Sequence, residues 1–589
     1  MLLATAPSAS AALKFGYTCG GNLECAHLKV PIDRGGAVPG TIRLRIDRLR
    51  GEKPQGAVFA IAGGPGQGAS SIEEGLNSDI NAALGHRDLI VIDQRGTGGS
   101  GALDCPTLDG RQQNRGTIDA RTAACAKYLG PRANHYTTAD SVADFDAVRA
   151  ALGIDKISLY GVSYGTDVAL AYAATYPDHV ERLILDSVVD PQDSDPFELT
   201  NLAALPRVFG EICRDECTGI TNDLAGDVAT LADRMPVRGR FVDGHGRVRT
   251  KKVTARDLYS TVRAADLDPF ARSEYPAAVH AAVAGDTAPL IRMVHRFDAV
   301  AVTPPPPPDA AEMLSFSLQA ATLCEEAPLP WDRTATPEQR DTQAQAAAAA
   351  IDDAKFAPFD RATVLVPDSN NLLYQCRSWP ALAQAPTIPD VSPDVPVLVF
   401  EGLEDTRTPL EVGQAVAARF PHAQLLAVPK TGHAVVGRRA CARTAIKRFF
   451  AGRSVAGLCA GLKGAALLPP PPVSVAAAKG PLAAFKLSLD DLSREVNVRF
   501  AAGGIGGLRG GSARFSKKNL TISGWSYVPG LALSGTVNGL TLAGLYTVRG
   551  ATAKTSGKLR LTRRGTLTGE LGGRAVRSRW RAPASPFLR

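Results

Sequence analysis

No apolar run in this chain of 589 residues approaches the roughly 20 residues that a helix needs to cross the hydrocarbon core of a membrane. We therefore expect no transmembrane segment. Hydrophobic residues make up 45% of the chain and charged residues 21%, which is typical of a globular protein and argues against a mainly disordered one. The length exceeds what one compact core usually holds, so we expect a large unit with an appendage.

C-x-x-C pairs are absent, and histidines do not accompany the cysteines at the spacing of a zinc site. The cysteines occur as near neighbours along the chain, and their number is even. This arrangement favours sequential disulfides formed in an oxidising compartment, although sequence alone does not fix which cysteines pair. The ten residues are Cys19, Cys25, Cys105, Cys125, Cys213, Cys217, Cys324, Cys376, Cys441 and Cys459.

The N-terminus, "MLLATAPSASAALKFGYTCG", lacks the positive charge and the long apolar stretch of a complete signal peptide. The small residues "SASAA" nevertheless resemble the end of one. We interpret residues 1–18 as a leader or the remnant of a signal peptide. Together with the cysteines, this predicts a protein that is secreted or held in the periplasm or cell envelope.

Acidic residues are scarce in one part of the chain. Residues 473–589 contain 19 Lys and Arg but only 4 Asp and Glu, a net charge of +15, whereas residues 1–472 carry a net charge of −7. This asymmetry indicates that the tail meets a polyanion, with a solvated basic domain as the alternative. Aromatic residues accompany the charges, but no nucleic-acid motif is present. In an exported protein we expect an anionic polymer of the cell envelope as the partner, and no nucleic acid. The aromatic residues are Trp525, Tyr527, Tyr546 and Trp580.

Short apolar runs that end in turn residues recur in the first part of the chain, as in "GAVFAIAGGPG", "DLIVIDQRGTGGS" and "KISLYGVSYG". A further run, "VPVLVFEGLED", comes much later. Since helical segments lie between such runs, they predict a largely parallel sheet covered on both faces. About 200 residues between Asp190 and Pro396 lack this rhythm and look mainly helical. We expect them to form a cap over the carboxyl ends of the strands, where open α/β sheets bind ligands.

The stretch "YGVSYGTDVALAYAATYP" places Ser163 between two glycines, after a strand and before a helix. This is the pattern of a nucleophile elbow, in which a tight turn projects the serine hydroxyl above the sheet. The helix that begins behind the serine favours negative charge on a developing oxyanion. A structural turn is the alternative interpretation. We predict that Ser163 is the nucleophile.

A serine nucleophile needs a base, and the base needs an orienting carboxylate. Histidine is scarce, with nine residues, and His433 in "PKTGHAVV" is the one on a loop after the last predicted strand. The preceding strand ends in "EGLEDTRTP", which offers Glu401, Glu404 and Asp405. We choose Asp405, which lies furthest past the strand end, with Glu404 as the alternative.

An oxyanion hole needs two backbone N–H donors. One is expected from Tyr164, the residue after the nucleophile. The other should come from "AGGPGQG", the turn that follows an early strand, where we choose Gly64 because Pro65 has no N–H. A turn that serves packing alone is the alternative.

The motifs "AGGPGQG", "DQRGTGGS", "GVSYGT", "GLEDTRTP" and "TGHAVV" occur in an order and spacing that resemble the tripeptidyl aminopeptidases, exported relatives of the proline iminopeptidases. The likeness covers roughly Cys19 to Cys459. It implies an α/β-hydrolase fold, a Ser163–Asp405–His433 triad, and release of short peptides from free N-termini. Asp93 and Arg95 of "DQRGTG" are expected to be scaffold residues.

Two positions depart from the family pattern. Ala62 stands where iminopeptidases usually have histidine, and the cap motif Cys-x-Asp reads "TLCEEAP". Glu326 matches the acidic position, and Glu325 precedes it. Because an exopeptidase needs a carboxylate to hold the substrate's ammonium group, these two glutamates are the expected substrate-binding residues. A solvated cap residue beside a disulfide is the alternative.

The expected fold class is α/β, an α/β-hydrolase fold with a large, mainly helical cap insertion and a C-terminal antiparallel β-domain. The function we predict is a serine exopeptidase that acts through an acyl-enzyme and needs no cofactor or metal. An esterase with the same triad, and a catalytically inactive envelope-binding protein, are the alternatives. The domains are the leader 1–18, core 19–190, cap 191–395, core 396–466, linker 467–484 and basic β-domain 485–589.

Overall fold

The computed structural model describes residues 13–19, 23–52, 54–110, 112, 115–192, 195–301, 309–368, 371–464, 466–498 and 504–583. The chain divides into two compact units. One comprises Met1–Glu211 and Thr303–Gly464, and the other comprises Ile212–Val302 and Ala465–Arg589. Part of the predicted cap therefore shares a unit with the C-terminal domain. Residues 1–12 of the predicted leader lie outside the described residues.

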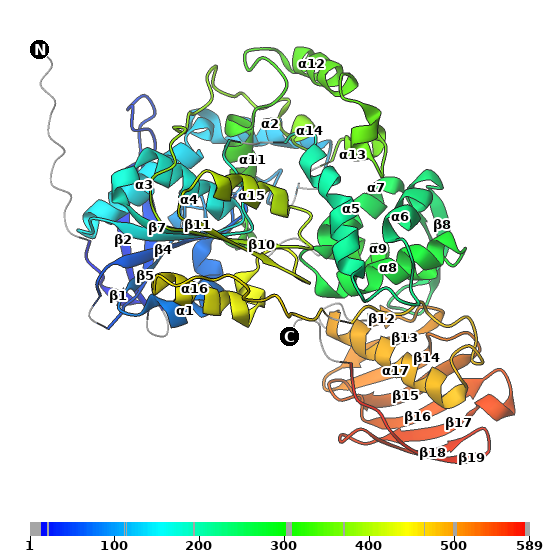
Figure 1. Cartoon of the computed structure of the whole chain (residues 1–589). Coiled ribbons are helices and arrows are strands. Elements are labelled where there is room, and N and C mark those ends of the chain that lie inside the picture. Colours follow the sequence, from blue (N-terminus) through cyan, green and yellow to red (C-terminus); the bar gives the residue numbers. More distant parts are fainter. Residues whose placement is uncertain are drawn as a thin grey trace, which may run out of the picture. The chain divides into compact units, whose positions relative to one another are not determined.

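A nine-stranded sheet forms the centre of the first unit (Figure 1). In their order across the sheet, β1, β2, β3 and β5 pair antiparallel, whereas β5, β4, β6, β7, β10 and β11 pair parallel. The predicted α/β-hydrolase sheet is thus confirmed. Across the sheet the strands are β1 (Tyr17–Thr18), β2 (Leu23–Pro31), β3 (Thr41–Leu49), β5 (Asp88–Ile92), β4 (Ala57–Ile61), β6 (Ile157–Val162), β7 (Val180–Asp186), β10 (Val397–Gly402) and β11 (Ala423–Val428).

The central strands are mostly apolar and buried because helices cover both faces of the sheet. All five residues of β4 and all five of β5 are buried. On one face α1 (Glu73–Leu84) and α16 (Ala440–Phe450) contribute Leu76, Ile80 and Ile446 to the core. The other face is covered by α2 (Ile118–Leu129), α3 (Thr138–Ala151), α4 (Tyr164–Thr175) and α15 (Leu410–Ala418).

The region between β7 and β10 is mainly helical, as its lack of strand rhythm predicts. A two-stranded hairpin, β8 (Val237–Val242) with β9 (Val248–Val253), interrupts it. The helices are α5 (Leu199–Cys213), α6 (Leu224–Asp233), α7 (Ala255–Ala265), α8 (Pro269–Val283), α9 (Ala288–Ala301), α10 (Ala310–Met313), α11 (Phe316–Glu326), α12 (Pro337–Ala349), α13 (Arg361–Val364) and α14 (Leu372–Cys376).

The C-terminal part is an eight-stranded antiparallel sheet whose strands pair in chain order, and α17 (Pro481–Val498) packs on one of its faces. This helix is not predicted from the sequence. Its buried residues include Phe485, Leu489, Leu492 and Val496, a spacing of three to four that marks one helical face. The strands are β12 (Gly504–Gly506), β13 (Gly510–Ser516), β14 (Asn519–Ser526), β15 (Leu531–Asn538), β16 (Gly544–Gly550), β17 (Gly557–Leu561), β18 (Thr566–Leu571) and β19 (Arg574–Arg579).

Every cysteine is paired with its neighbour along the chain, as the sequential arrangement predicts. The disulfides are Cys19–Cys25, Cys105–Cys125, Cys213–Cys217, Cys324–Cys376 and Cys441–Cys459. In the described part of the chain, no helix combines the length and the apolar character needed to cross a bilayer.

Candidate active site

Ser163 lies in a sharp turn between the end of β6 and the start of α4. Its φ of 56° and ψ of −127° are unusual for a residue with a side chain. The turn is held by its own backbone, because the Ser163 N–H donates to the Asp186 carbonyl at 2.9 Å and the Ser163 carbonyl accepts from the Thr166 N–H at 2.8 Å. Backbone strain of this kind, fixed by surrounding hydrogen bonds, is characteristic of a nucleophile elbow.

The two glycines around Ser163 are needed because backbones approach closely there. A Cβ atom at Gly161 would lie 2.3 Å from the Gly165 carbonyl oxygen, and one at Gly165 would lie 2.4 Å from the Ile61 carbonyl oxygen. Both contacts are with backbone atoms, which cannot move aside as a side chain can. The glycine spacing in "GVSYG" therefore allows β6, α4 and the end of β4 to meet at one point.

Asp405 and His433 come together after β10 and β11. The His433 Nδ1 atom lies 2.8 Å from Asp405 Oδ2. Thr408 donates its hydroxyl to the same carboxylate oxygen at 2.8 Å, and the Arg407 and Thr408 N–H groups donate to Oδ1 at 2.8 and 3.0 Å. Burial raises the pKa of Asp405, but His433 and these hydrogen bonds outweigh burial and hold the pKa below its usual value.

The contact of His433 with Asp405 agrees with the choice of that carboxylate over its neighbours. Glu401 instead accepts the Val188 N–H at 3.0 Å. Burial raises the pKa of Glu401 well above its usual value, and the charge of Asp405 adds to the rise.

Asp186, at the end of β7, positions the histidine loop and was not singled out from the sequence. Its carboxylate accepts the Val435 and Val436 N–H groups at 2.7 and 2.9 Å, while the neighbouring Ser187 hydroxyl accepts the Ala434 N–H at 2.9 Å. The same strand end thus holds the elbow through the Asp186 carbonyl and the histidine loop through its side chain. An aspartate directly after the buried run "RLIL" is the sequence signal that could have revealed it.

The glycine-rich turn after β4 passes beside the nucleophile. A Cβ atom at Gly63 would lie 3.1 Å from the Ser163 Cβ atom. Gly64 has a φ of 111°, which a side chain would disfavour. The turn is fixed from the other side, because the Ser315 N–H donates to the Gly66 carbonyl at 2.9 Å.

Asp93 and Arg95 lie behind this turn as scaffold residues. Asp93 accepts the Ser70 and Gly99 N–H groups at 2.8 and 2.7 Å, and Arg95 donates two hydrogen bonds to Asp144. Each is 1% exposed. Their burial and partners agree with the scaffold role expected from the sequence.

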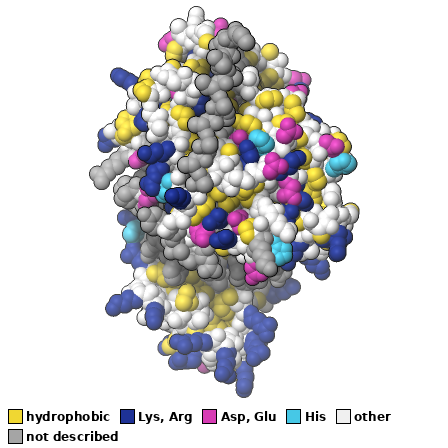
Figure 2. Space-filling view, turned by 90° about the vertical axis from the view of Figure 1, so that its left-hand side faces the viewer, with side chains coloured by type: hydrophobic (Ala, Val, Ile, Leu, Met, Phe, Trp, Pro, Cys, Tyr) yellow, Lys and Arg dark blue, Asp and Glu magenta, His cyan; other side chains and the backbone are white. Residues whose placement is uncertain are grey.

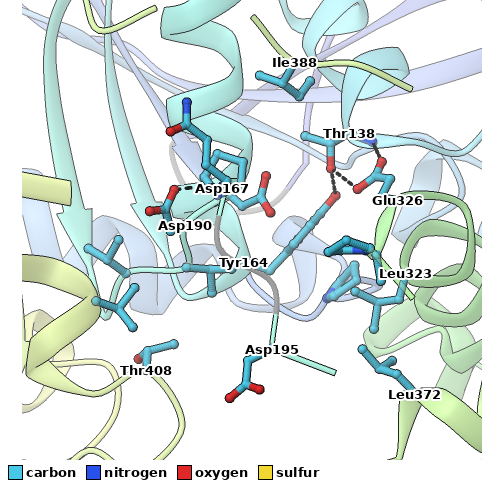
Figure 3. Close-up of a pocket in the computed structure, with 18 of the residues that line it drawn as sticks. Thr138, Tyr164, Asp167, Asp190, Asp195, Leu323, Glu326, Leu372, Ile388 and Thr408 are labelled. Carbon is cyan, nitrogen blue, oxygen red and sulfur yellow. Dashed lines mark hydrogen bonds between the residues drawn. The ribbon is translucent and has the colours of Figure 1, made fainter. Parts of the chain in front are cut away.

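A cavity of about 380 Å³ opens beside the elbow, and both Gly64 and Tyr164 line it (Figure 3). The charged part of its lining is mainly acidic, since four carboxylates, those of Asp167, Asp190, Asp195 and Glu326, stand against the one arginine, Arg407. A pocket of this composition favours a cationic group over an anionic one.

Glu326 is held at the cavity wall by Thr138. The Thr138 hydroxyl donates to Glu326 Oε2 at 2.7 Å, and the Thr138 N–H donates to Oε1. The same hydroxyl lies 2.7 Å from the Tyr164 hydroxyl, so the hydrogen bonds run from the cap residue to the first residue of α4 (Figure 3). Burial raises the pKa of Glu326 to about 7, against these hydrogen bonds.

Asp167 is a pocket carboxylate that the sequence analysis missed, although it stands in the quoted stretch. It lies one helical turn after Ser163 on α4, and Figure 3 shows its carboxyl group pointing into the cavity, like that of Glu326. Burial raises the pKa of Asp167 well above its usual value, and the charges of Glu326 and Asp190 add to the rise. An acidic residue one turn past a nucleophile is the signal that could have found it.

Asp190 already has a cationic partner, since it pairs with Arg419 at 2.8 Å. Asp195 accepts the Thr200 N–H at 2.6 Å, and Glu326 accepts the two hydrogen bonds of Thr138. Within the described residues no ion pair is found for Asp167, Asp195 or Glu326, so the cavity holds carboxylates that no cation neutralises.

Glu325 points into a different environment. It is 0% exposed, pairs with Arg333 at 3.0 Å and accepts the Trp379 indole N–H at 3.0 Å and the Leu382 N–H at 3.2 Å. These partners occupy its carboxylate within the cap. The geometry thus separates the two adjacent glutamates, with Glu326 at the cavity and Glu325 inside the cap's own packing.

The comparisons with known proteins agree with this fold. The α/β hydrolase fold family matches residues 56–215, and the TAP-like protein family matches residues 364–456. The chain has the α/β-hydrolase fold, and its region similar to the TAP-like protein family contains Asp405 and His433.

Among curated relatives, the chain is 26% identical to the tripeptidyl aminopeptidase of Streptomyces coelicolor over 455 residues, which cover 70% of this chain and 78% of the relative. It is 30% identical to the serine protease Hip1 of Mycobacterium tuberculosis over 208 residues, 29% of this chain and 39% of the relative. It is 32% identical to the proline iminopeptidase of Neisseria meningitidis over 155 residues, 26% of this chain and 39% of the relative. Several relatives with peptidase names support a hydrolase with a peptidase role.

Proposed function

We propose that the protein is a serine exopeptidase that removes short peptides from free N-termini. The observation that carries the proposal is the combination of a strained Ser163, a buried Asp405–His433 pair and a cavity with carboxylates that lack an ion pair, Asp167 and Glu326 among them. Ser163 and the Asp405–His433 pair provide the groups needed for acyl transfer, and the cavity provides a place for an ammonium group. Substrate release as tripeptides is proposed from the likeness to the tripeptidyl aminopeptidases.

His433 acts as the general base in this mechanism. Because its Nδ1 atom faces Asp405, the Nε2 atom is the one that takes the Ser163 proton during attack on the scissile carbonyl. Asp405 keeps the imidazole in this tautomer and stabilises the imidazolium that forms. His433 then gives the proton to the leaving amine. In the second half of the reaction, His433 takes a proton from the water that attacks the acyl-enzyme and gives it to the Ser163 oxygen as the acyl group leaves.

The oxyanion hole is assigned to the N–H groups of Tyr164 and Gly64. Tyr164 is the first residue of α4, where N–H groups point out of the helix and the helix dipole favours negative charge. Gly64 lies in the turn that passes beside Ser163. Such preorganised donors usually contribute the largest electrostatic stabilisation in acyl transfer.

Glu326 and Asp167 are assigned to the substrate's ammonium group. A free N-terminus carries a positive charge below its pKa of about 8, and pairing with two buried carboxylates would offset the cost of desolvating that charge. Glu325 is assigned a structural role in the cap instead, because its carboxylate accepts hydrogen bonds from four residues, Asn134, Arg333, Trp379 and Leu382.

A panel of four substrates tests the exopeptidase proposal against the esterase alternative. Tripeptidyl amides and the matching esters would each be supplied with a free and with an acetylated N-terminus. We expect turnover of the free-amine amide, with acetylation reducing kcat/KM. Turnover of esters without any amide cleavage would overturn the peptidase proposal and favour an esterase. A protein that cleaves none of the four and does not react with a fluorophosphonate probe would be the inactive alternative.

We further propose that the protein acts outside the cytoplasm and is retained on an anionic polymer of the cell envelope. Five disulfides suit an oxidising compartment. The specific observation that favours the polymer is the exposure of cationic side chains on the strands of the C-terminal sheet.

A further inference from the structure

One face of the C-terminal sheet is free of the helix that covers the other. Side chains alternate along each strand, so the buried residues Tyr546, Leu559 and Leu567 face the core under α17. The residues before and after them on each strand therefore point to the outward face, away from α17. On β16, β17 and β19 the exposed residues of this outward face include five cations, Arg549, Lys558, Arg560, Arg577 and Arg579.

The strand register sets the four cations of β17 and β19 in two rows. Arg560 of β17 stands opposite Thr568 of β18, and Thr568 stands opposite Arg577 of β19. Arg579 is opposite Thr566 on the same side. Since neighbouring strands lie about 4.8 Å apart, the rows on β17 and β19 are roughly 10 Å apart, with threonine hydroxyl groups between them. We name this surface the β17–β19 track.

Small residues leave the track open. A groove on this face is lined by the small residues Thr568, Gly569, Gly573 and Ala575, with Lys558 and Arg560 along one side, and Leu545 and Glu570 complete its lining. Figure 2 shows Lys and Arg side chains gathered over the C-terminal domain, with few acidic side chains among them. An extended chain of anions could therefore lie along β18 between the two rows.

The acidic residues of the domain do little to neutralise the track. Three of the four lie on α17, where Asp490 accepts the Trp580 indole N–H at 2.7 Å, Asp491 pairs with Arg292 at 2.8 Å and Glu495 pairs with Arg296 at 3.0 Å. The fourth, Glu570, stands opposite Lys558 on the outward face. Within the described residues, no ion pair is found for the three arginines of the track, Arg560, Arg577 and Arg579.

The aromatic residues that could have stacked nucleic-acid bases face the other way. Trp525 and Tyr546 are 0% exposed, Tyr527 is 5% exposed and Trp580 is 7% exposed. Proteins that bind single-stranded nucleic acid without sequence preference rely on exposed aromatic platforms as well as charge. The outward face offers arginine forks and hydroxyl donors instead, which match the oxygens of phosphate groups.

We propose that the β17–β19 track binds a linear phosphodiester polymer without bases, with the polymer running along β18. This inference rests on the proposed retention on an anionic polymer and names the surface and the chemistry of the ligand. Arg560 and Arg577 are its central contacts because they face each other across Thr568. The peptidase site takes no part in it.

Binding of the full-length protein to poly(glycerol phosphate) tests the track. The double variant Arg560→Ser/Arg577→Ser is compared with Lys517→Asn/Lys518→Ser, which removes two exposed cations at the β13–β14 turn of the same domain. The track variant should bind at least tenfold more weakly, and the slope of log K against log salt should become shallower by one to two, because fewer counterions are released. The control variant should bind within threefold of the unchanged protein.

Three outcomes overturn parts of the proposal and are distinguishable. Equal losses in the two variants would show a diffuse charge effect and reject the track. Binding of oligo(dT) or of polygalacturonate tenfold tighter than poly(glycerol phosphate) would reject the phosphodiester ligand. No binding of the unchanged protein to any of these probes at low salt would reject the polymer-retention function as a whole. Unchanged peptidase activity and melting temperature in both variants confirm that the comparison concerns folded protein.

Discussion

At the scale of single residues, acidic side chains that are adjacent in sequence lie in different environments. Glu325 and Glu326 are neighbours in sequence, yet one is enclosed by Arg333 and Trp379 and the other lines the cavity. Burial raises the pKa values of both Asp167 and Glu326, and negative charges add to both rises, with Glu326 acting on Asp167 and with Asp140 and Glu325 acting on Glu326. A cationic substrate would relieve that repulsion, which makes charge the basis of substrate selection.

The variant Glu326→Gln should weaken binding of substrates with a free amine. Loss of a charge-assisted contact of about 1.5–3 kcal/mol corresponds to a rise in KM of roughly 10- to 150-fold, with a smaller effect on acetylated substrates. The control is Glu338→Gln, since Glu338 is exposed on α12 and should leave KM unchanged. Equal KM values for the free-amine substrate in the two variants would reject the anchor.

The pH dependence of KM should follow the ionisation of the pocket. Because the pKa of Glu326 is raised to about 7, the carboxylate form is lost as pH falls through 7 and gained as pH rises through it. KM for a free-amine substrate should therefore fall between pH 6 and pH 7.5, and rise again above about pH 8 as the substrate amine loses its proton. Acetylated substrates lack the ammonium group, so a fall of equal size in their KM would contradict the assignment.

At the scale of elements, the elbow works because three backbone segments meet without side chains between them. Gly165→Ala should lower both activity and stability, since its Cβ atom would lie 2.4 Å from the Ile61 carbonyl oxygen at the end of β4. Thermal unfolding and kcat measure the two effects. The matched control is Gly75→Ala in α1, where a Cβ atom has no neighbour within 4 Å, and this change should be neutral or stabilise by up to about 1 kcal/mol. A Gly165→Ala variant as active and stable as this control would contradict the packing argument.

The sequence reveals elements well where a local pattern determines them. β4, β5, β6 and β10 are recognisable as buried apolar runs, and "GVSYG" identifies the elbow, because strand burial and glycine spacing are both visible over a few residues. The helix α17 was missed because its apolar spacing stands beside a stretch rich in glycine and short strands. The roles of Asp167, Thr138 and Asp186 were missed because they arise from contacts between segments distant in sequence, which no local pattern records.

At the scale of the whole molecule, the C-terminal domain is more than an attachment on a linker. Within the second unit, α9 is joined to α17 by buried ion pairs, Arg292 with Asp491 and Arg296 with Glu495. The linker itself takes part, since the Leu468 N–H donates to the Ser273 carbonyl on α8 at 2.9 Å. The domain and this part of the predicted cap region therefore form one packed body.

Removal of residues 473–589 should consequently destabilise residues 255–301. The deletion would remove the partners of Arg292 on α17 and would leave Arg296 paired with Glu274 of α8 alone, so α8 and α9 would lose the ion pairs that fix them from the other side. Hydrogen exchange of the amides in α8 and α9 should become much faster in the truncated chain. Protection equal to that of the full-length protein would show that the domain is a separable appendage. The effect also means that surface variants, and not truncations, are the right means of testing polymer binding.

Ser163→Ala tests the central claim most directly. The measurement is kcat for a tripeptidyl amide with a free N-terminus, with folding of the variant confirmed by its melting temperature. If Ser163, Asp405 and His433 act as one unit, kcat should fall by about 10⁶-fold, because no member of a triad replaces the nucleophile. A folded Ser163→Ala protein whose kcat stays within tenfold of the unchanged enzyme would contradict the account.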